Sequence, residues 1–128
     1  MNFSKKIETK TATLFIENDI MYTLYKEGSD VHLKDIEENF NVRLKFQQGK
    51  KIRILVDVKD VWQFSERARK FAGSDQLSDI TIAMAVLIGS SMPVMIIANF
   101  FMKFNKPKTP TKLFKSEKKS LEWLENYK

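Results

Sequence analysis

The amino-acid sequence predicts an α/β domain in which a mixed sheet of four to five strands is flanked by about four helices. Two β-branched, aromatic-rich segments, 11–17 and 20–26, flank the turn-forming pair Asn18-Asp19 and predict an N-terminal hairpin. Helix-like and strand-like segments then alternate, and two of the strands, 52–58 and 80–88, are apolar almost throughout. Such strands are typical of parallel sheets covered on both faces. All 128 residues are expected to form a single domain with one core.

The first helix is expected over residues 31–48. Gly28-Ser29-Asp30 is expected to end the hairpin and to supply the N-cap, and Gly49 to supply the C-cap. Apolar residues recur at steps of three and four and predict one buried stripe, formed by Leu33, Ile36, Phe40 and Leu44.

The shorter elements are predicted from capping residues and breakers. Ser65 is expected to cap a short helix that Gly73 closes. Residues 74–79 are expected to form a turn or a short helical piece. After the proline-containing connector 106–110, a short edge strand is expected at 111–115. Ser116 then caps a last helix, whose inner face carries Leu121 and Leu124 with Trp123 beside them.

An uncharged run, 80–102, allows two interpretations. A helix that crosses a bilayer needs roughly 20 apolar residues, and this run is long enough. However, Gly89-Ser90-Ser91-Met92-Pro93 divides it, and Pro is favourable in the first turn of a helix. Strand 52–58 also needs a parallel neighbour. We therefore expect a buried strand, 80–88, followed by a buried helix, 91–103, in a soluble protein without a transmembrane segment.

Positive charge is concentrated near the C-terminus. The net charge is +6, and residues 103–128 carry eight Lys and three Glu. This region is expected to be a solvated lysine-rich surface, or one that attracts phosphates or anionic lipid. The chain has no Cys and a single His, which excludes disulfides and thiolate metal sites. Residues 1–10 lack the apolar segment of a signal peptide, so a cytoplasmic location is expected.

Several sequence pieces together resemble the STAS/SpoIIAA-like domains, in the small bacterial branch of STAS/SEC14-domain proteins of unassigned function. The pieces are GKKIRILVDV, FSERARKFA, NFFMKFNKP, PTKLF and LEWL, and the resemblance extends over about residues 14–124. It implies a mixed sheet with helices packed on it, no catalytic centre, and a role in molecular interaction. In related anti-sigma-factor antagonists a serine after a central strand is phosphorylated. Ser65 lies at the matching place, but Gln63-Phe64-Ser65-Glu66-Arg67 departs from the antagonists' motif.

The predicted binding edge lies at the carboxyl ends of the two apolar strands, where open α/β sheets bind ligands. Loops 57–65 and 89–92 should meet there, and helices starting near Ser65 and Ser91 would point free N–H groups outward. Both serines are equally explained as ordinary N-caps. Phosphorylation of Ser65 would place a dianion near Arg67 and Arg69. The candidate binding residues are Asp57, Trp62, Ser65, Arg67, Gly89, Ser90 and Ser91.

Other residue groups have a structural and a functional interpretation. Trp62 and Phe64 either fold back onto the core or form a partner surface. Met84, Met92, Met95 and Met102 either fill the core or line a lipid cavity. His32, near Asp30 and Asp35, is expected to be a surface residue rather than a metal ligand. We predict no catalytic residues, no metal and no cofactor.

The resulting functional hypothesis is a non-enzymatic interaction or regulatory module that binds a protein partner at the edge formed by 57–65 and 89–92. The alternative is a carrier or sensor of a lipid or another small hydrophobic or anionic ligand, with helix 91–103 as a lid. A weaker alternative is nucleic-acid binding through the C-terminal lysines, which would depend strongly on salt. The edge strand and the apolar helix also allow a homodimer.

Overall fold

The computed structural model describes residues 5–128 and confirms the predicted fold class. Six strands form the main sheet in the order β1-β2-β3-β5-β7-β8, one more than expected because a two-residue strand precedes the hairpin. The first three strands pair antiparallel, and β3, β5, β7 and β8 pair parallel. The strands are β1 (Ile7–Glu8), β2 (Ala12–Glu17), β3 (Ile20–Tyr25), β5 (Ile52–Asp57), β7 (Thr81–Leu87) and β8 (Thr111–Phe114).

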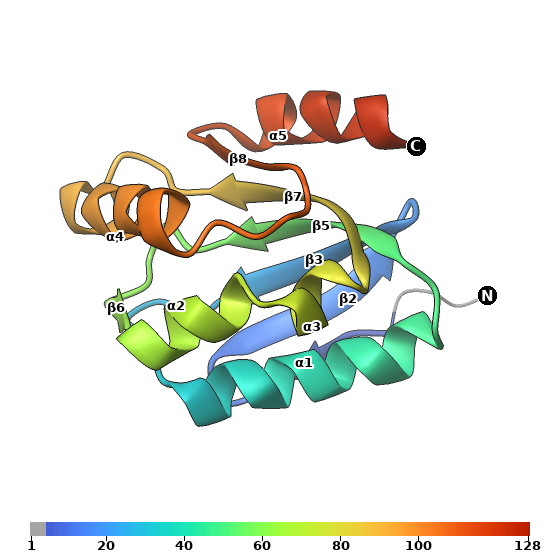
Figure 1. Cartoon of the computed structure of the whole chain (residues 1–128), viewed down its shortest axis with the longest axis horizontal. Helices are drawn as coiled ribbons and strands as arrows, with labels where there is room; N and C mark the ends of the chain where they lie inside the picture. Colours follow the sequence, from blue (N-terminus) through green and yellow to red (C-terminus); the bar gives the residue numbers. More distant parts are fainter. Residues whose placement is uncertain (1–4) are drawn as a thin grey trace.

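Helices cover the sheet unequally on its two faces (Figure 1). One face packs against α5, whose Leu124 lies in a cluster with Leu55 and Ala85. The other face packs against α1, α2 and α4, and a second cluster there joins Ile36 and Ala98 to strand residues. The helices are α1 (Leu33–Gln47), α2 (Glu66–Ala72), α3 (Asp75–Ser78), α4 (Met92–Phe104) and α5 (Glu117–Leu124), followed by the 3-10 turn η1 (Glu125–Tyr127).

The N-terminal hairpin forms as its sequence predicts. Glu17 of β2 pairs with Ile20 of β3, so Asn18 and Asp19 form the two-residue turn. Their φ angles are 54° and 62°, and these residue types tolerate the left-handed region better than most.

The start of α1 differs from the prediction. His32, not Ser29 or Asp30, is the N-cap, and the Asp35 carboxylate accepts a hydrogen bond from the backbone N–H of His32 at 2.9 Å. Asp30 is unavailable as a cap because it belongs to β4 (Asp30–Val31), which pairs with β6 (Gln63–Phe64) in a separate two-stranded sheet. Two-residue strands leave no periodic pattern in a sequence, so neither was predicted.

The buried face of α1 is rotated from the predicted stripe. Ile36 is buried, but Leu44 is 43% exposed, so its place in the stripe was wrong. The buried positions also include Asn39, Arg43 and Gln47, at steps of four. These polar side chains tolerate burial because they donate or accept hydrogen bonds with the ends of neighbouring strands and loops.

The uncharged run is divided into β7 and α4, as predicted, with Ser91 as the N-cap and Pro93 in the first turn. Within residues 5–128, no helix is both long and apolar enough to cross a membrane. However, α4 is not the buried helix that its composition suggested. Only Val94, Ala98 and Phe101 are buried in it, because the helix lies on the outside of the sheet and has no layer beyond it (Figure 1).

Candidate functional site

The two loops predicted to form a binding edge do meet. At the carboxyl ends of β5 and β7, the N–H of Val58 donates to the carbonyl of Leu87 at 2.9 Å. Gly89 approaches so closely that a Cβ at this position would lie 3.0 Å from Cβ of Lys59. The φ of Gly89 is +63°, a conformation that favours glycine. This residue therefore allows the tight approach of the two loops.

Two of the three candidate serines act as helix caps. The Ser65 hydroxyl accepts from the N–H of Ala68 at 3.1 Å, and that of Ser91 accepts from the N–H of Val94 at 3.4 Å. Ser90 is exposed. The N–H groups at the two helix starts are thus partly satisfied within the chain, and neither start by itself indicates an anion site.

The charged candidates at the edge pair locally or point into solvent. Asp57 forms an ion pair with Lys59, and this hydrogen bond raises the pKa of Lys59. Arg69 donates to the carbonyl of Phe64 at 2.7 Å, whereas Arg67 is exposed. Phosphorylation of Ser65 and pairing with these arginines remain predictions.

The two loop aromatics have different surroundings. Phe64 packs edge-on against Tyr25, with 5.3 Å between ring centroids, so it folds back onto the core. Trp62 does not; it is 67% exposed. A single exposed apolar side chain is ordinary on a protein surface, so Trp62 by itself marks no binding site.

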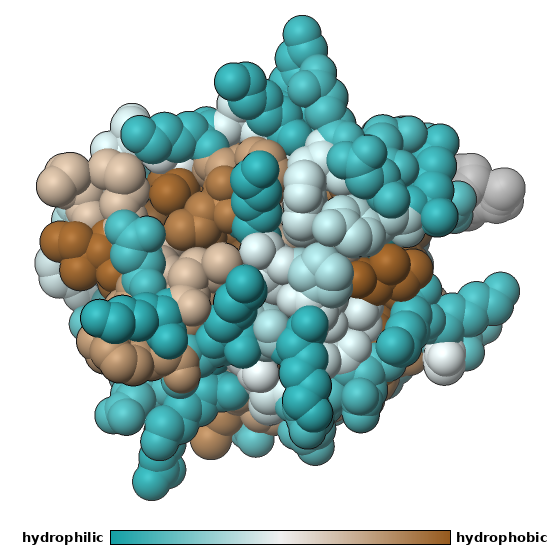
Figure 2. Space-filling model, turned by 45° about the horizontal axis from the view of Figure 1, so that its top comes forward, coloured by the Kyte–Doolittle hydropathy of each residue, from teal (hydrophilic) through white to brown (hydrophobic). Residues whose placement is uncertain are grey.

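The outer face of α4 carries a continuous apolar ridge. Its members recur at every fourth position, and Figure 2 shows the hydrophobic colour gathered over this helix. The rings of Phe100 and Phe104 pack together with 4.6 Å between centroids. The exposed fractions are 64% for Met92, 64% for Ile96, 46% for Phe100 and 59% for Phe104.

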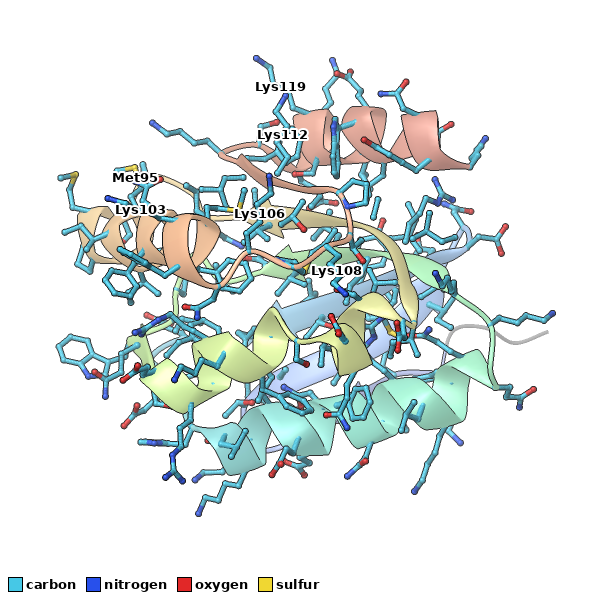
Figure 3. The ribbon with its side chains drawn as sticks, in the orientation of Figure 1. Met95, Lys103, Lys106, Lys108, Lys112 and Lys119 are labelled. Atoms are coloured by element: carbon cyan, nitrogen blue, oxygen red, sulfur yellow. The ribbon has the colours of Figure 1, made fainter. Side chains whose placement is uncertain are left out.

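Lysines lie along one side of this ridge. Residues 80–116 contain five Lys and no acidic residue. Figure 3 shows lysines following one another from α4 through the connector to β8 and α5. Lys108 pairs with Asp75 at 3.3 Å, and the ammonium of Lys103 lies 5.3 Å from the ring centroid of Phe104. The ridge and the basic band thus form one surface, which we call the α4 face.

A cavity of about 120 Å³ lies beneath α4. Its walls come from the sheet, α1, α2, α3 and the inner side of α4, and they are mostly apolar. The space is partly open to its surroundings rather than sealed, so it can admit a small guest.

Three polar side chains in the cavity wall were not anticipated from the sequence. Thr23 and Ser78 are 4% and 8% exposed, and neither hydroxyl has a hydrogen-bond partner within residues 5–128. Arg43 is 4% exposed, and burial lowers its pKa to about 10. Sequence patterns place polar residues in solvent, so only the tertiary structure shows that these three side chains are buried. Of the four methionines considered, Met84 lines the cavity.

His32 pairs with Asp30, with 3.1 Å between Nε2 and Oδ2. Hydrogen bonds from Gln63 and then from His32 lower the pKa of Asp30. Asp35, the third residue considered as a metal ligand, instead accepts a hydrogen bond at the start of α1. Across the described residues 5–128, no three His, Asp or Glu side chains gather in a way that would hold a metal ion.

Comparison with known proteins identifies the family. The model of a family described as "Domain of unknown function (DUF7793)" matches residues 14–128. The chain belongs to this family. No curated protein matches the DUF7793 chain. A solved structure from Shewanella loihica PV-4, described as an uncharacterized protein from the DUF3478 family with a SpoIIAA-like fold, matches with a TM-score of 0.58. At 18% identity the alignment covers 87% of this chain and 90% of that one.

This similarity confirms the STAS/SpoIIAA-like fold that the sequence pieces indicated. The fold by itself assigns no activity to the DUF7793 chain, because one fold hosts many functions. The α4 face is therefore the feature from which a function can be proposed.

Proposed function

We propose that this DUF7793 domain is a non-enzymatic interaction module that docks through the α4 face onto the surface of an anionic bilayer. The single observation that carries this proposal is the exposed apolar ridge of α4, followed along the chain by lysines in a segment, 80–116, that itself contains no acidic residue. This surface begins at the predicted edge 57–65 and 89–92, because Met92 is the last residue of loop 89–92 and the first residue of α4.

The shape of the ridge favours a bilayer. A helix of 13 residues presents about 20 Å of length. It lies outside the sheet with no layer beyond it (Figure 1), and its exposed side chains are long, flexible or aromatic. Amphipathic helices with such an apolar face and nearby basic residues lie in the membrane interface.

Charge favours anionic lipid in particular. Each lysine near a negatively charged membrane contributes about 1 kcal/mol of attraction. Residues 80–116 contain five Lys and no acidic residue, so no side chain of this segment repels anionic lipid. The same charge would suit an acidic surface on a protein partner, the class of partner that the sequence hypothesis placed at the edge 57–65 and 89–92.

Vesicle co-sedimentation tests the proposal. The protein should bind vesicles of phosphatidylcholine with about one-third phosphatidylglycerol, bind pure phosphatidylcholine weakly, and lose binding as salt rises. The double variant Met92→Glu, Ile96→Glu should bind at least about tenfold more weakly, because both positions are exposed and the change places charge on the ridge. Leu44→Glu is the matched control, since Leu44 is an exposed apolar residue of α1.

The outcomes separate the two partner classes. Equal loss in the Leu44→Glu control, or no binding of the wild-type protein to anionic vesicles, would overturn the bilayer proposal. In the latter case a partner protein with an acidic surface would be the better explanation of the α4 face.

A further inference from the structure

The cavity beneath α4 has mostly apolar walls, and its lining includes an arginine without a counter-ion. Its apolar walls include Ile54, Val86 and Phe101, whereas Arg43, Thr23 and Ser78 contribute polar groups. These features are independent of the α4 face, which lies on the opposite side of the helix.

Arg43 has donors left over. Its Nε donates to Oε1 of Gln47 at 2.8 Å, and its Nη2 donates to Oγ1 of Thr81 at 2.9 Å and to the carbonyl of Ile80 at 3.3 Å. A guanidinium has five N–H donors. The two on Nη1 make no hydrogen bond to any of residues 5–128.

Arg43 also lacks a counter-ion. All of its acceptors are neutral, and no carboxylate of residues 5–128 forms a salt bridge with it. With a pKa of about 10 the guanidinium is protonated at neutral pH. A buried charge without a partner is costly, and an anion beside it would offset part of that cost.

The size of the cavity limits the occupant. An apolar cavity of about 150 Å³ binds benzene, whereas a single water needs only about 10–15 Å³. The 120 Å³ present here exceeds the need of one water. Water filling the whole space would face mostly hydrocarbon and find few partners. A branched hydrocarbon group smaller than a benzene ring is the better match.

We propose that this cavity binds a small monocarboxylate with a short branched hydrocarbon body, whose carboxylate pairs with Arg43. The carboxylate accepts from Nη1, and the unpaired hydroxyls of Thr23 on β3 and Ser78 on α3 are further donors in the cavity lining. The hydrocarbon body contacts the sheet and the inner side of α4, which includes Ala98.

Calorimetric titration in the absence of lipid tests the proposal. The probes are 2-methylpropanoate and 3-methylbutanoate, each compared with its neutral amide. At least one acid should bind the wild-type protein about tenfold or more tightly than its amide, as expected for a charge-assisted hydrogen bond. Arg43→Met should remove this preference, and Arg43→Lys should retain part of it because the charge remains.

Two further measurements keep the test decisive if Arg43→Met fails to fold. The acid should shift the NMR signal of the Arg43 guanidinium in the wild-type protein, and its amide should not. Ala98→Leu should weaken binding of every probe because its side chain occupies the cavity. The inference is overturned if acids and amides bind equally, if none binds at millimolar concentration, or if Ala98→Leu binds unchanged. None of these results depends on vesicle binding.

Discussion

Replacing Ala98 with leucine should stabilise the protein, although most substitutions of buried alanines by larger residues do the opposite. Ala98 lies on the inner side of α4, is 5% exposed and lines the 120 Å³ cavity. Leucine adds three carbons, and burial contributes about 0.8 kcal/mol for each, or about 2.4 kcal/mol in total. Fixing the leucine rotamer costs about 0.5–1 kcal/mol. We therefore expect a net gain of about 1.5 kcal/mol.

Urea denaturation measures this change directly as a rise in the midpoint at constant m-value. The matched control is Ala85→Leu. Ala85 is fully buried on the opposite face of the sheet, in a cluster with Leu55 and Leu124, and does not line the cavity. There the same three carbons should overpack the core and cost about 1–3 kcal/mol. If Ala98→Leu destabilised the protein as much as Ala85→Leu, the cavity would not be an open space and the reasoning would be refuted.

Three further predictions concern a close contact, a helix cap and a buried phenol. Gly73→Ala should lower the free energy of unfolding by about 1–3 kcal/mol in urea titrations, because a Cβ there would lie 1.7 Å from the carbonyl oxygen of Asn105. An unchanged midpoint would contradict that contact. Ser65→Ala should cost about 1 kcal/mol through loss of its cap, whereas Ser90→Ala, at an exposed position, should change stability by less than about 0.5 kcal/mol; equal effects would contradict the capping role. Burial raises the pKa of Tyr25 to about 12 from an ordinary value of about 10, so the unfolded chain loses this proton first as pH rises. The stability that Tyr25 contributes should therefore decline between about pH 10 and 12, and a wild-type minus Tyr25→Phe difference that stayed constant over this range would be evidence against the shift.

Much of the fold was predictable from local signals. The hairpin turn, the caps Ser65, Ser91 and Ser116, and the division of the uncharged run at Gly89 all depend on residues within a few positions of one another. Such features follow from backbone preferences and single hydrogen bonds. The short strands β4 and β6 were missed because a pair of two-residue strands is stabilised by tertiary placement and not by its own pattern.

The candidate site was only partly predictable. The meeting of loops 57–65 and 89–92 follows from parallel strand order, and the structure agrees. The exposure of the α4 ridge does not follow, because composition alone cannot show whether another layer covers an apolar helix. The burial of Arg43 was missed for the opposite reason, since a charged residue is assigned to solvent unless its partners are known.

The sequence by itself determined the α/β class, the order of the elements and the resemblance to STAS/SpoIIAA-like domains, because periodicity, capping and turn chemistry act locally. Only the tertiary structure decided which sides of α1 and α4 face inward. That choice depends on how helices pack over the sheet, and it leaves Ile96 and Phe100 in solvent while enclosing Arg43 beside an apolar cavity. The two surfaces on which the proposals depend are products of packing between distant segments, and no local pattern encodes them.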